Sequence, residues 1–107
     1  LRELLPTLAD DEGRTALVCS NDLYAIELLD ETRRLGLEPP RDFGLVGFDG
    51  LSLLRFIRPA LATLAYPTRE TGAAAVDLAL SLLEGKPVVD RILPHAFRAG
   101  ETLAAAT

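Results

Sequence analysis

Short apolar runs alternate with amphipathic stretches along the first half of the chain. The run over residues 15–19 has the length and composition of a strand buried on both faces. Capping side chains follow it, and we expect a helix over residues 22–35, because charged and apolar residues separate onto opposite faces at helical spacing. Its apolar face consists of Ala25, Leu28, Leu29, Thr32 and Leu35, and its polar face of Glu27, Asp30, Glu31 and Arg34.

The alternation continues in the second half. Strands are expected over residues 43–48 and 61–65, with an irregular or briefly helical segment over 51–58 between them. A strongly apolar helix is expected from its capping residue Thr68 to Glu84, with Gly85 placed to end it. Further short strands are expected over 88–93 and 95–99, and residues 1–9 have the pattern of a helix end. Strands that alternate with helices predict an α/β fold with a parallel, doubly wound sheet.

Composition narrows the classes of protein. The 107 residues allow one small domain, and a content of 49% apolar residues excludes a disordered tail. No apolar run has the length of a membrane span, and no signal peptide is visible. A net charge of −5 disfavours direct binding to nucleic acid, because an acidic surface repels phosphate. Since the sequence has no methionine and opens within a helical pattern, we expect a fragment of a longer protein.

The residues that most often carry chemistry are scarce. Cys19 is the single cysteine and His95 the single histidine, so neither an internal disulfide nor a Cys/His zinc cage can be assembled. We expect Cys19 to be a small core residue and His95 to lie at the surface or at an interface. Nucleophile elbows, phosphate-binding glycine loops and metal-ligand spacings are missing. We therefore expect no catalytic residue, metal, cofactor or enzyme activity, and the single thiol fits the cytoplasm.

Polar side chains follow each of the three predicted parallel strands. Asn21 and Asp22 come after the first, Asp49 after the second and Tyr66 after the third. Open parallel sheets bind ligands outside the carboxyl ends of their strands. An amide, a carboxylate and a phenol suit the hydroxyl groups of a sugar or a similar polar small molecule. Asn21, Asp49 and Tyr66 are therefore our candidate ligand-binding residues.

Each of these side chains also has a purely structural interpretation. Asn21 suits a helix cap, and Asp22 suits a partner of the helix dipole. Asp49 precedes a glycine and suits a turn, whereas Tyr66 precedes a proline and can simply pack where the chain crosses over. The spacing of the sequence leaves both interpretations open.

The ordered motifs resemble those of the LacI/GalR family of transcription regulators. An Asn-Asp pair opens a helix within residues 19–25, and a Gly-Leu-Glu-Pro-Pro turn at 36–40 leads to a strand that ends in Val-Gly-Phe-Asp at 46–49. Residues 59–64 are similar to the family's Pro-Pro-Leu-Thr-Thr segment, and residues 82–85 and 92–94 also fit. Two positions depart from the pattern: Tyr66 replaces a common glutamine, and Gly100 lies where the family usually has an arginine, with Arg98 two positions earlier.

This resemblance implies a partial periplasmic-binding-protein type I fold, with the C-terminal lobe plus one crossover element of the N-terminal lobe. Residues 1–65 and 94–107 would belong to the C-terminal lobe and residues 66–93 to the N-terminal lobe. The chain would then bind an effector and dimerise within a regulator that contacts DNA only through an N-terminal helix-turn-helix outside this chain. Asn21 and Asp49 correspond to effector-contacting positions. A solute-binding protein of a sugar transporter shares the fold and is the alternative.

Apolar residues in two segments predict a contact between copies of the chain. Leu23 and Ile26 lie toward the polar side of the first helix, and Phe56 and Ile57 follow the turn at residues 49–50. If they form one exposed patch, a symmetric homodimer is expected; the alternative is that the chain itself covers them. We also expect the apolar helix over 68–84 to pack against another copy or to fold back onto its own sheet.

Overall fold

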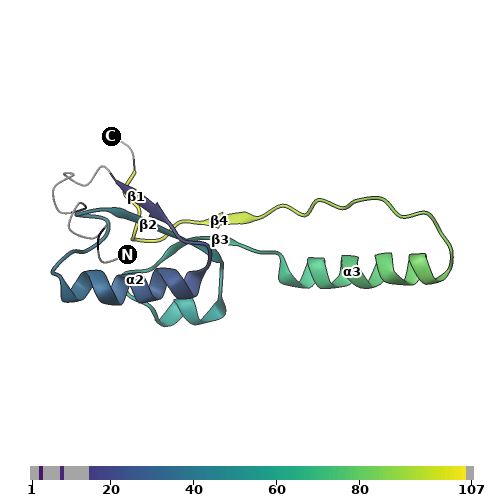
Figure 1. Ribbon diagram of the computed structural model, residues 1–107, viewed down its shortest axis with the longest axis horizontal. Coiled ribbons are helices and arrows are strands. Elements are labelled where there is room, and N and C mark those ends of the chain that lie inside the picture. Colours follow the sequence, from purple (N-terminus) through teal and green to yellow (C-terminus); the bar gives the residue numbers. More distant parts are fainter. Residues whose placement is uncertain (1–2, 4–7, 9–14, 106–107) are drawn as a thin grey trace.

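The chain forms an open four-stranded sheet with helices on one side (Figure 1). The structure is a computed structural model and describes residues 3, 8 and 15–105. The strands lie in chain order, the first three run parallel, and the last is antiparallel to its neighbour. They are β1 (Ala16–Val18), β2 (Gly44–Asp49), β3 (Ala62–Ala65) and β4 (Ala96–Arg98). The predicted α/β class and its mostly parallel sheet are therefore confirmed, with strand ends within about two residues of those expected.

Helix α2 (Asp22–Arg34) packs against β2, as its pattern predicts. The backbone N–H of Tyr24 donates to Asn21 Oδ1 at 2.9 Å and caps the helix. The predicted apolar face is buried except at its last position: Leu35 is the C-cap residue and is 59% exposed. Its backbone has left the helical conformation, so the side chain no longer follows the buried face. Gly36 ends the helix at a φ of +76°, where a side chain would be strained.

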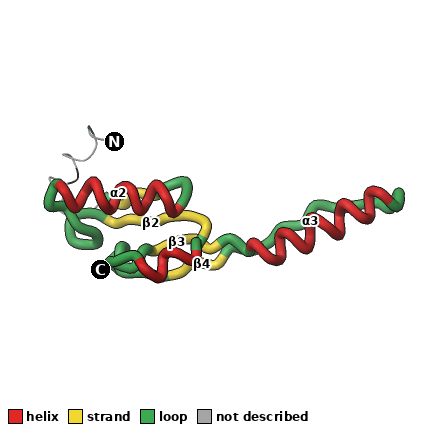
Figure 2. The backbone as a smooth tube through the Cα atoms, turned by 90° about the horizontal axis from the view of Figure 1, so that it is seen from below, coloured by secondary structure: helices red, strands yellow, loops and turns green. Residues whose placement is uncertain are grey.

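The core lies between α2 and one face of the sheet, which Figure 2 shows from the side of the helices. The opposite face has no helix over it among the described residues (Figure 1). The register places Val18 beside Val46, and Phe97 beside Leu64, on this uncovered face. Val18 is 74% exposed, so the prediction that the first strand is buried on both faces is wrong. It fails because β1 is an edge strand with only one face covered. The core residues are Leu8, Ala25, Leu28, Leu29, Phe43, Leu45 and Leu61.

Thr102 joins the amino ends of β2 and β3. Its backbone carbonyl accepts from Leu45 N at 2.8 Å, and its hydroxyl donates to Leu45 O at 2.7 Å and accepts from Ala62 N at 2.9 Å. The residue is fully buried. The Thr102 side chain therefore links β2 to β3. It lies two residues after Gly100, the position at which the sequence departs from the family's arginine.

Helix α3 (Thr68–Leu83) and the segment after it extend away from the sheet (Figure 1). Ala74 is the one buried residue of α3, and Leu83 is 84% exposed. The helix therefore does not fold back onto its own sheet, which contradicts one of the two predicted packings. Contact with another copy stays a prediction.

Two further predictions fail in this extended part. Residues 88–93 form no strand, because they run beside α3 and have no neighbouring strand to pair with (Figure 1). Pro67, not Thr68, is the N-cap of α3, and the Thr68 hydroxyl donates instead to Tyr66 O at 3.3 Å. Most of the helix expected over residues 1–9 lies outside the described residues; of its members, Leu8 is helical and lies in the core.

Candidate functional site

The carboxyl ends of β1, β2 and β3 meet at one edge of the sheet and are joined by Asp22. Asp22 Oδ1 accepts from the Thr63 hydroxyl at 2.6 Å, and Oδ2 accepts from Leu51 N at 2.7 Å. The carboxylate is completely buried, and Gly47 leaves the space for it. Asp22 is thus the structural anchor of this edge, a role that goes beyond the interaction with the helix dipole expected from its position at the start of α2.

Asn21 lies at this edge and uses part of its side chain for capping. Its Oδ1 is the acceptor for Tyr24 N, and the residue is half-buried. Its amide nitrogen has no partner among residues 15–105. The capping interpretation is therefore correct, and a donor remains for a ligand.

Asp49 ends β2 in an unusual backbone conformation. Its φ of +110° lies in a region that residues with a side chain rarely adopt. Its backbone oxygen accepts from Tyr66 N at 2.9 Å, which holds the ends of β2 and β3 together. The carboxylate has no hydrogen bond or ion pair within the part of the chain from 15 to 105. The backbone of Asp49 thus has a structural role, and its half-buried side chain is available.

Tyr66 follows β3 and packs against His95, which was not among the predicted ligand-binding residues. The centroids of the Tyr66 and His95 rings lie 5.4 Å apart, and those of Phe48 and His95 lie 5.2 Å apart. His95 directly precedes β4, and the antiparallel pairing of Ala65 with Ala96 brings it beside Tyr66. No signal in the local sequence predicts this, because the contact depends on which strand β4 pairs with.

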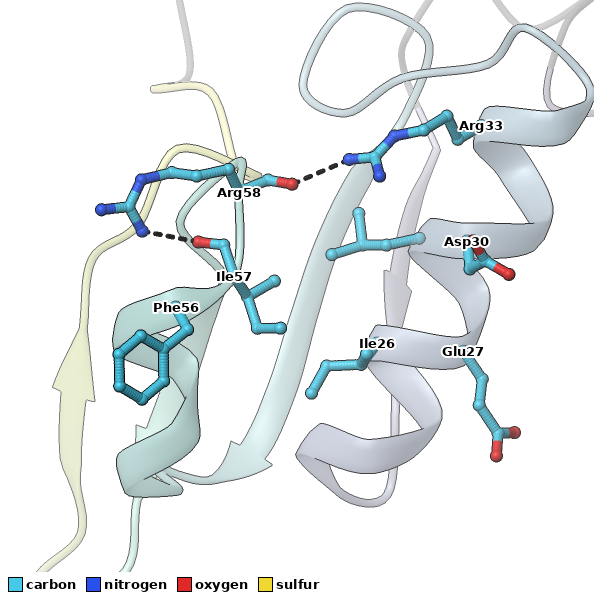
Figure 3. Close-up of a pocket in the computed structure, with 8 residues that line it drawn as sticks. Ile26, Glu27, Asp30, Arg33, Phe56, Ile57 and Arg58 are labelled. Carbon is cyan, nitrogen blue, oxygen red and sulfur yellow. Dashed lines mark hydrogen bonds between the residues drawn. The ribbon is translucent and has the colours of Figure 1, made fainter.

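A second feature is the groove between α2 and the 3-10 helix η1 (Ser52–Phe56), which has a volume of about 490 Å³ (Figure 3). Ile26 and Ile57 face each other across it, and Phe56 lies at its edge. The side chain of Arg33 donates to Arg58 O at 2.8 Å and bridges one end. The structure thus brings together three of the four predicted dimer residues, whereas Leu23 is exposed but does not line the groove.

Other candidate chemistry is sparse. Cys19 is half-buried against the core, and burial raises the pKa of its thiol, which disfavours the reactive thiolate. Among the described residues, no three His, Cys, Asp or Glu side chains are grouped so as to hold a metal ion. Within the same part of the chain, every helix is too short or too polar to cross a bilayer.

Comparison with known proteins agrees with the fold. Residues 1–102 match the family described as periplasmic binding protein-like domain, and the chain belongs to this family. Its relatives are transcription regulators of the LacI type. The Escherichia coli K12 repressor CytR is 38% identical over 74 residues, which are 69% of this chain and 22% of CytR.

Solved structures give the same result. A LacI family regulator from Arthrobacter sp. FB24, in complex with lactose, has a TM-score of 0.76 and 30% identity over 94% of this chain and 38% of the regulator. A dimeric Lac repressor has a TM-score of 0.81 and 26% identity over 97% of this chain and 39% of the repressor. These relatives are regulators and not enzymes, in agreement with the prediction. The chain spans 22% of the length of CytR.

Proposed function

We propose that this chain is the effector-binding and dimerisation module of a LacI-type transcription regulator, and that it binds a sugar or similar polar metabolite through Asn21, Asp49 and Tyr66. The observation that carries the proposal is the arrangement of these residues at adjacent carboxyl ends of β1, β2 and β3. This edge is where open parallel sheets bind ligands. A structural relative in complex with lactose supports the choice of a sugar.

The available atoms suit hydroxyl groups. The Asp49 carboxylate has no partner among residues 15–105 and can accept from two neighbouring hydroxyls, each bond being strengthened by its charge. The Asn21 amide nitrogen donates, and the Tyr66 hydroxyl both donates and accepts. A polyol ring with hydroxyls along one edge can use all three.

The proposal is tested by titration calorimetry on the protein that carries this chain, expressed from its complete coding sequence. The probes are lactose, maltose, D-galactose and D-ribose. For the probe that binds to the parent protein, Asp49→Ala should weaken the binding of that sugar by about 1.5–3 kcal/mol, the range for a hydrogen bond to a charged group. Glu31→Ala, which removes a carboxylate of α2 that pairs with Arg34 and lies outside the groove between α2 and η1, should bind as the parent does.

The melting temperature separates the two roles of Asp49. If Asp49→Ala binds the sugar with unchanged affinity, Asp49 is a turn residue that does not contact the ligand. An equal loss of affinity and of thermal stability would make it structural. If no sugar binds to the parent protein, the sugar assignment is wrong.

The groove between α2 and η1 supports the second half of the proposal. Phe56 is 72% exposed beside the groove, and Ile26 and Ile57 form its apolar sides. A second copy that presents the same surface about a twofold axis would cover them. A structural relative that is a dimeric repressor supports dimerisation.

In this proposal residues 1–65 and 94–107 belong to the C-terminal lobe and residues 66–93 to the N-terminal lobe of a two-lobed domain. Effector binding would then change how a cytoplasmic dimer holds DNA through a helix-turn-helix outside these residues. The solute-binding alternative shares the fold, but regulators among the relatives favour the present proposal. An operator-binding assay with and without the sugar distinguishes the two functions.

A further inference from the structure

The side chain of His95 reaches the candidate effector site from a fourth segment of the chain. It directly precedes β4, in the register that places Ala96 beside Ala65, so it lies where β3 ends and Tyr66 begins the connection to α3. Its ring is tilted by 47° to Phe48 and by 52° to Tyr66. Contacts with two aromatic rings restrict the orientation of the imidazole.

The polar atoms of this imidazole are free. His95 is exposed, and neither of its ring nitrogens has a hydrogen-bond partner among residues 15–105. A neutral imidazole offers one donor and one acceptor. The aromatic contacts therefore hold a donor–acceptor pair in place without using either of its polar atoms.

The neighbouring rings add apolar surface to the same site. Phe48 directly precedes Asp49, and Tyr66 N donates to Asp49 O, so both aromatic residues are tied to the candidate carboxylate through the backbone. Tyr66 is 40% exposed and Phe48 is half-buried. Small-molecule sites typically combine such aromatic surface with a few fixed polar groups.

We propose that His95 is a recognition residue for a neutral polyhydroxylated ring, which it hydrogen-bonds through an imidazole nitrogen while the ring rests on Phe48 and Tyr66. The proposal depends on the proposed function, because it places His95 in the same effector site. It adds a residue from the β4 side to those from β1, β2 and β3. It also gives a role to an exposed histidine that contacts two aromatic rings.

The test separates the nitrogens of His95 from its packing. His95→Phe keeps a flat ring between Phe48 and Tyr66 but removes both nitrogens, whereas His95→Gln keeps a donor and an acceptor without the ring. In the complete protein, titrated with lactose, maltose, D-galactose and D-ribose, His95→Phe should raise the Kd of the binding sugar about threefold to tenfold, the effect of one lost hydrogen bond. His95→Gln should lose less, and the melting temperature of both variants should match that of the parent.

A second readout follows His95 in the parent protein itself. In the parent protein labelled with ¹⁵N-histidine, addition of the binding sugar should shift the His95 ring-nitrogen resonances, which are assigned by their absence from His95→Gln. Unshifted resonances, or an unchanged Kd in His95→Phe beside a weakened Asp49→Ala, overturn the role of His95 and leave the proposed function intact. If the parent binds none of the four sugars, the sugar assignment fails, and the role of His95 fails with it.

Discussion

The buried carboxylate of Asp22 accepts a 2.6 Å hydrogen bond from the hydroxyl of Thr63, a residue 41 positions later in the chain. The same carboxylate holds Leu51 N, so one side chain joins the start of α2 to the segment after β2 and to β3. Both bonds involve a charged acceptor without exposure to water, which is the arrangement in which hydrogen bonds contribute most. The edge that carries the candidate site is therefore held by a residue that is not itself available to a ligand.

Asp22→Ala should lower the free energy of unfolding by about 3 kcal/mol, because the Leu51 N–H and the Thr63 hydroxyl would lose their acceptor in a buried position. Urea denaturation of the complete protein measures the loss. Glu31→Ala removes a carboxylate of the same helix that is partly exposed and paired with Arg34, and it should cost only about 0.5 kcal/mol. Equal effects of the two substitutions would contradict the anchoring role of Asp22.

Gly47→Ala should also destabilise the fold, by about 1–3 kcal/mol, through overpacking. A Cβ at this position would overlap Asp22 Oδ1 and lie 3.0 Å from Leu61 Cδ2, both in the interior. Gly72→Ala is the matched control: it lies in α3 with no atom within 4 Å of the added Cβ, and alanine favours a helix by about 1 kcal/mol. Thermal melts should move in opposite directions for the two variants.

Acid should weaken one local contact in the loop between α2 and β2. Arg41 and the backbone N–H of Glu38 both donate to Asp42, and they hold the pKa of its carboxyl below its usual value of about 3.9. The folded state thus keeps this group ionised at pH values where the unfolded chain protonates it, so its stabilising effect is present above about pH 4 and is lost as the pH falls through the lowered folded pKa.

The urea midpoint of the parent should therefore exceed that of Asp42→Asn at pH 7, and the difference should shrink progressively below about pH 4. Arg41→Gln removes the main cause of the lowered pKa, so the loss of stability in acid should be smaller and should be complete at a higher pH than in the parent. A difference that stays constant from pH 7 to pH 3 would show that the contact makes no contribution through ionisation.

Charges placed in the groove between α2 and η1 should separate the proposed dimer. Ile26→Asp combined with Phe56→Asp would bury two carboxylates in an apolar contact and should give the mass of one protomer in light scattering. We choose Phe56 over Ile57 because Ile57 also packs against the core of its own chain. Leu35→Asp changes an exposed leucine at the end of α2 outside the groove and should leave the dimer intact; an unchanged mass in the double variant would reject this interface.

Periodic features of the sequence predict the fold well, because they depend on neighbours in the chain. The faces of α2 and the positions of β2 and β3 follow from apolar spacing, and the ends of the helices from Gly36 and Gly85. Residues 88–93 have the apolar, branched side chains of a strand but lack a neighbour to pair with, which no local pattern reveals. The predicted burial of Leu35 is wrong because α2 ends at Arg34, one residue before the end of its apolar pattern, and no local pattern reveals this.

The candidate site is predicted only in part from the sequence. Asn21, Asp49 and Tyr66 follow from the rule that polar residues after parallel strands share one edge. The roles of Thr63 and His95 depend on contacts between segments that are distant in the sequence. Thr63 contacts Asp22, and His95 contacts Tyr66. The positive φ of Asp49 is likewise a property of the folded backbone, although the glycine that follows it marks a turn.

The uncovered face of the sheet has a consequence for the colloidal behaviour of this polypeptide in isolation. Val18 and Phe97 lie on that face with most of their surface in water, and Val18 belongs to β1, an edge strand of the described sheet. The net charge of −5 opposes association. At 0.1 M salt, however, the repulsion between charges more than about 10 Å apart is largely screened. A solution of the isolated 107-residue polypeptide should therefore be clear at low ionic strength and turn turbid as salt is added.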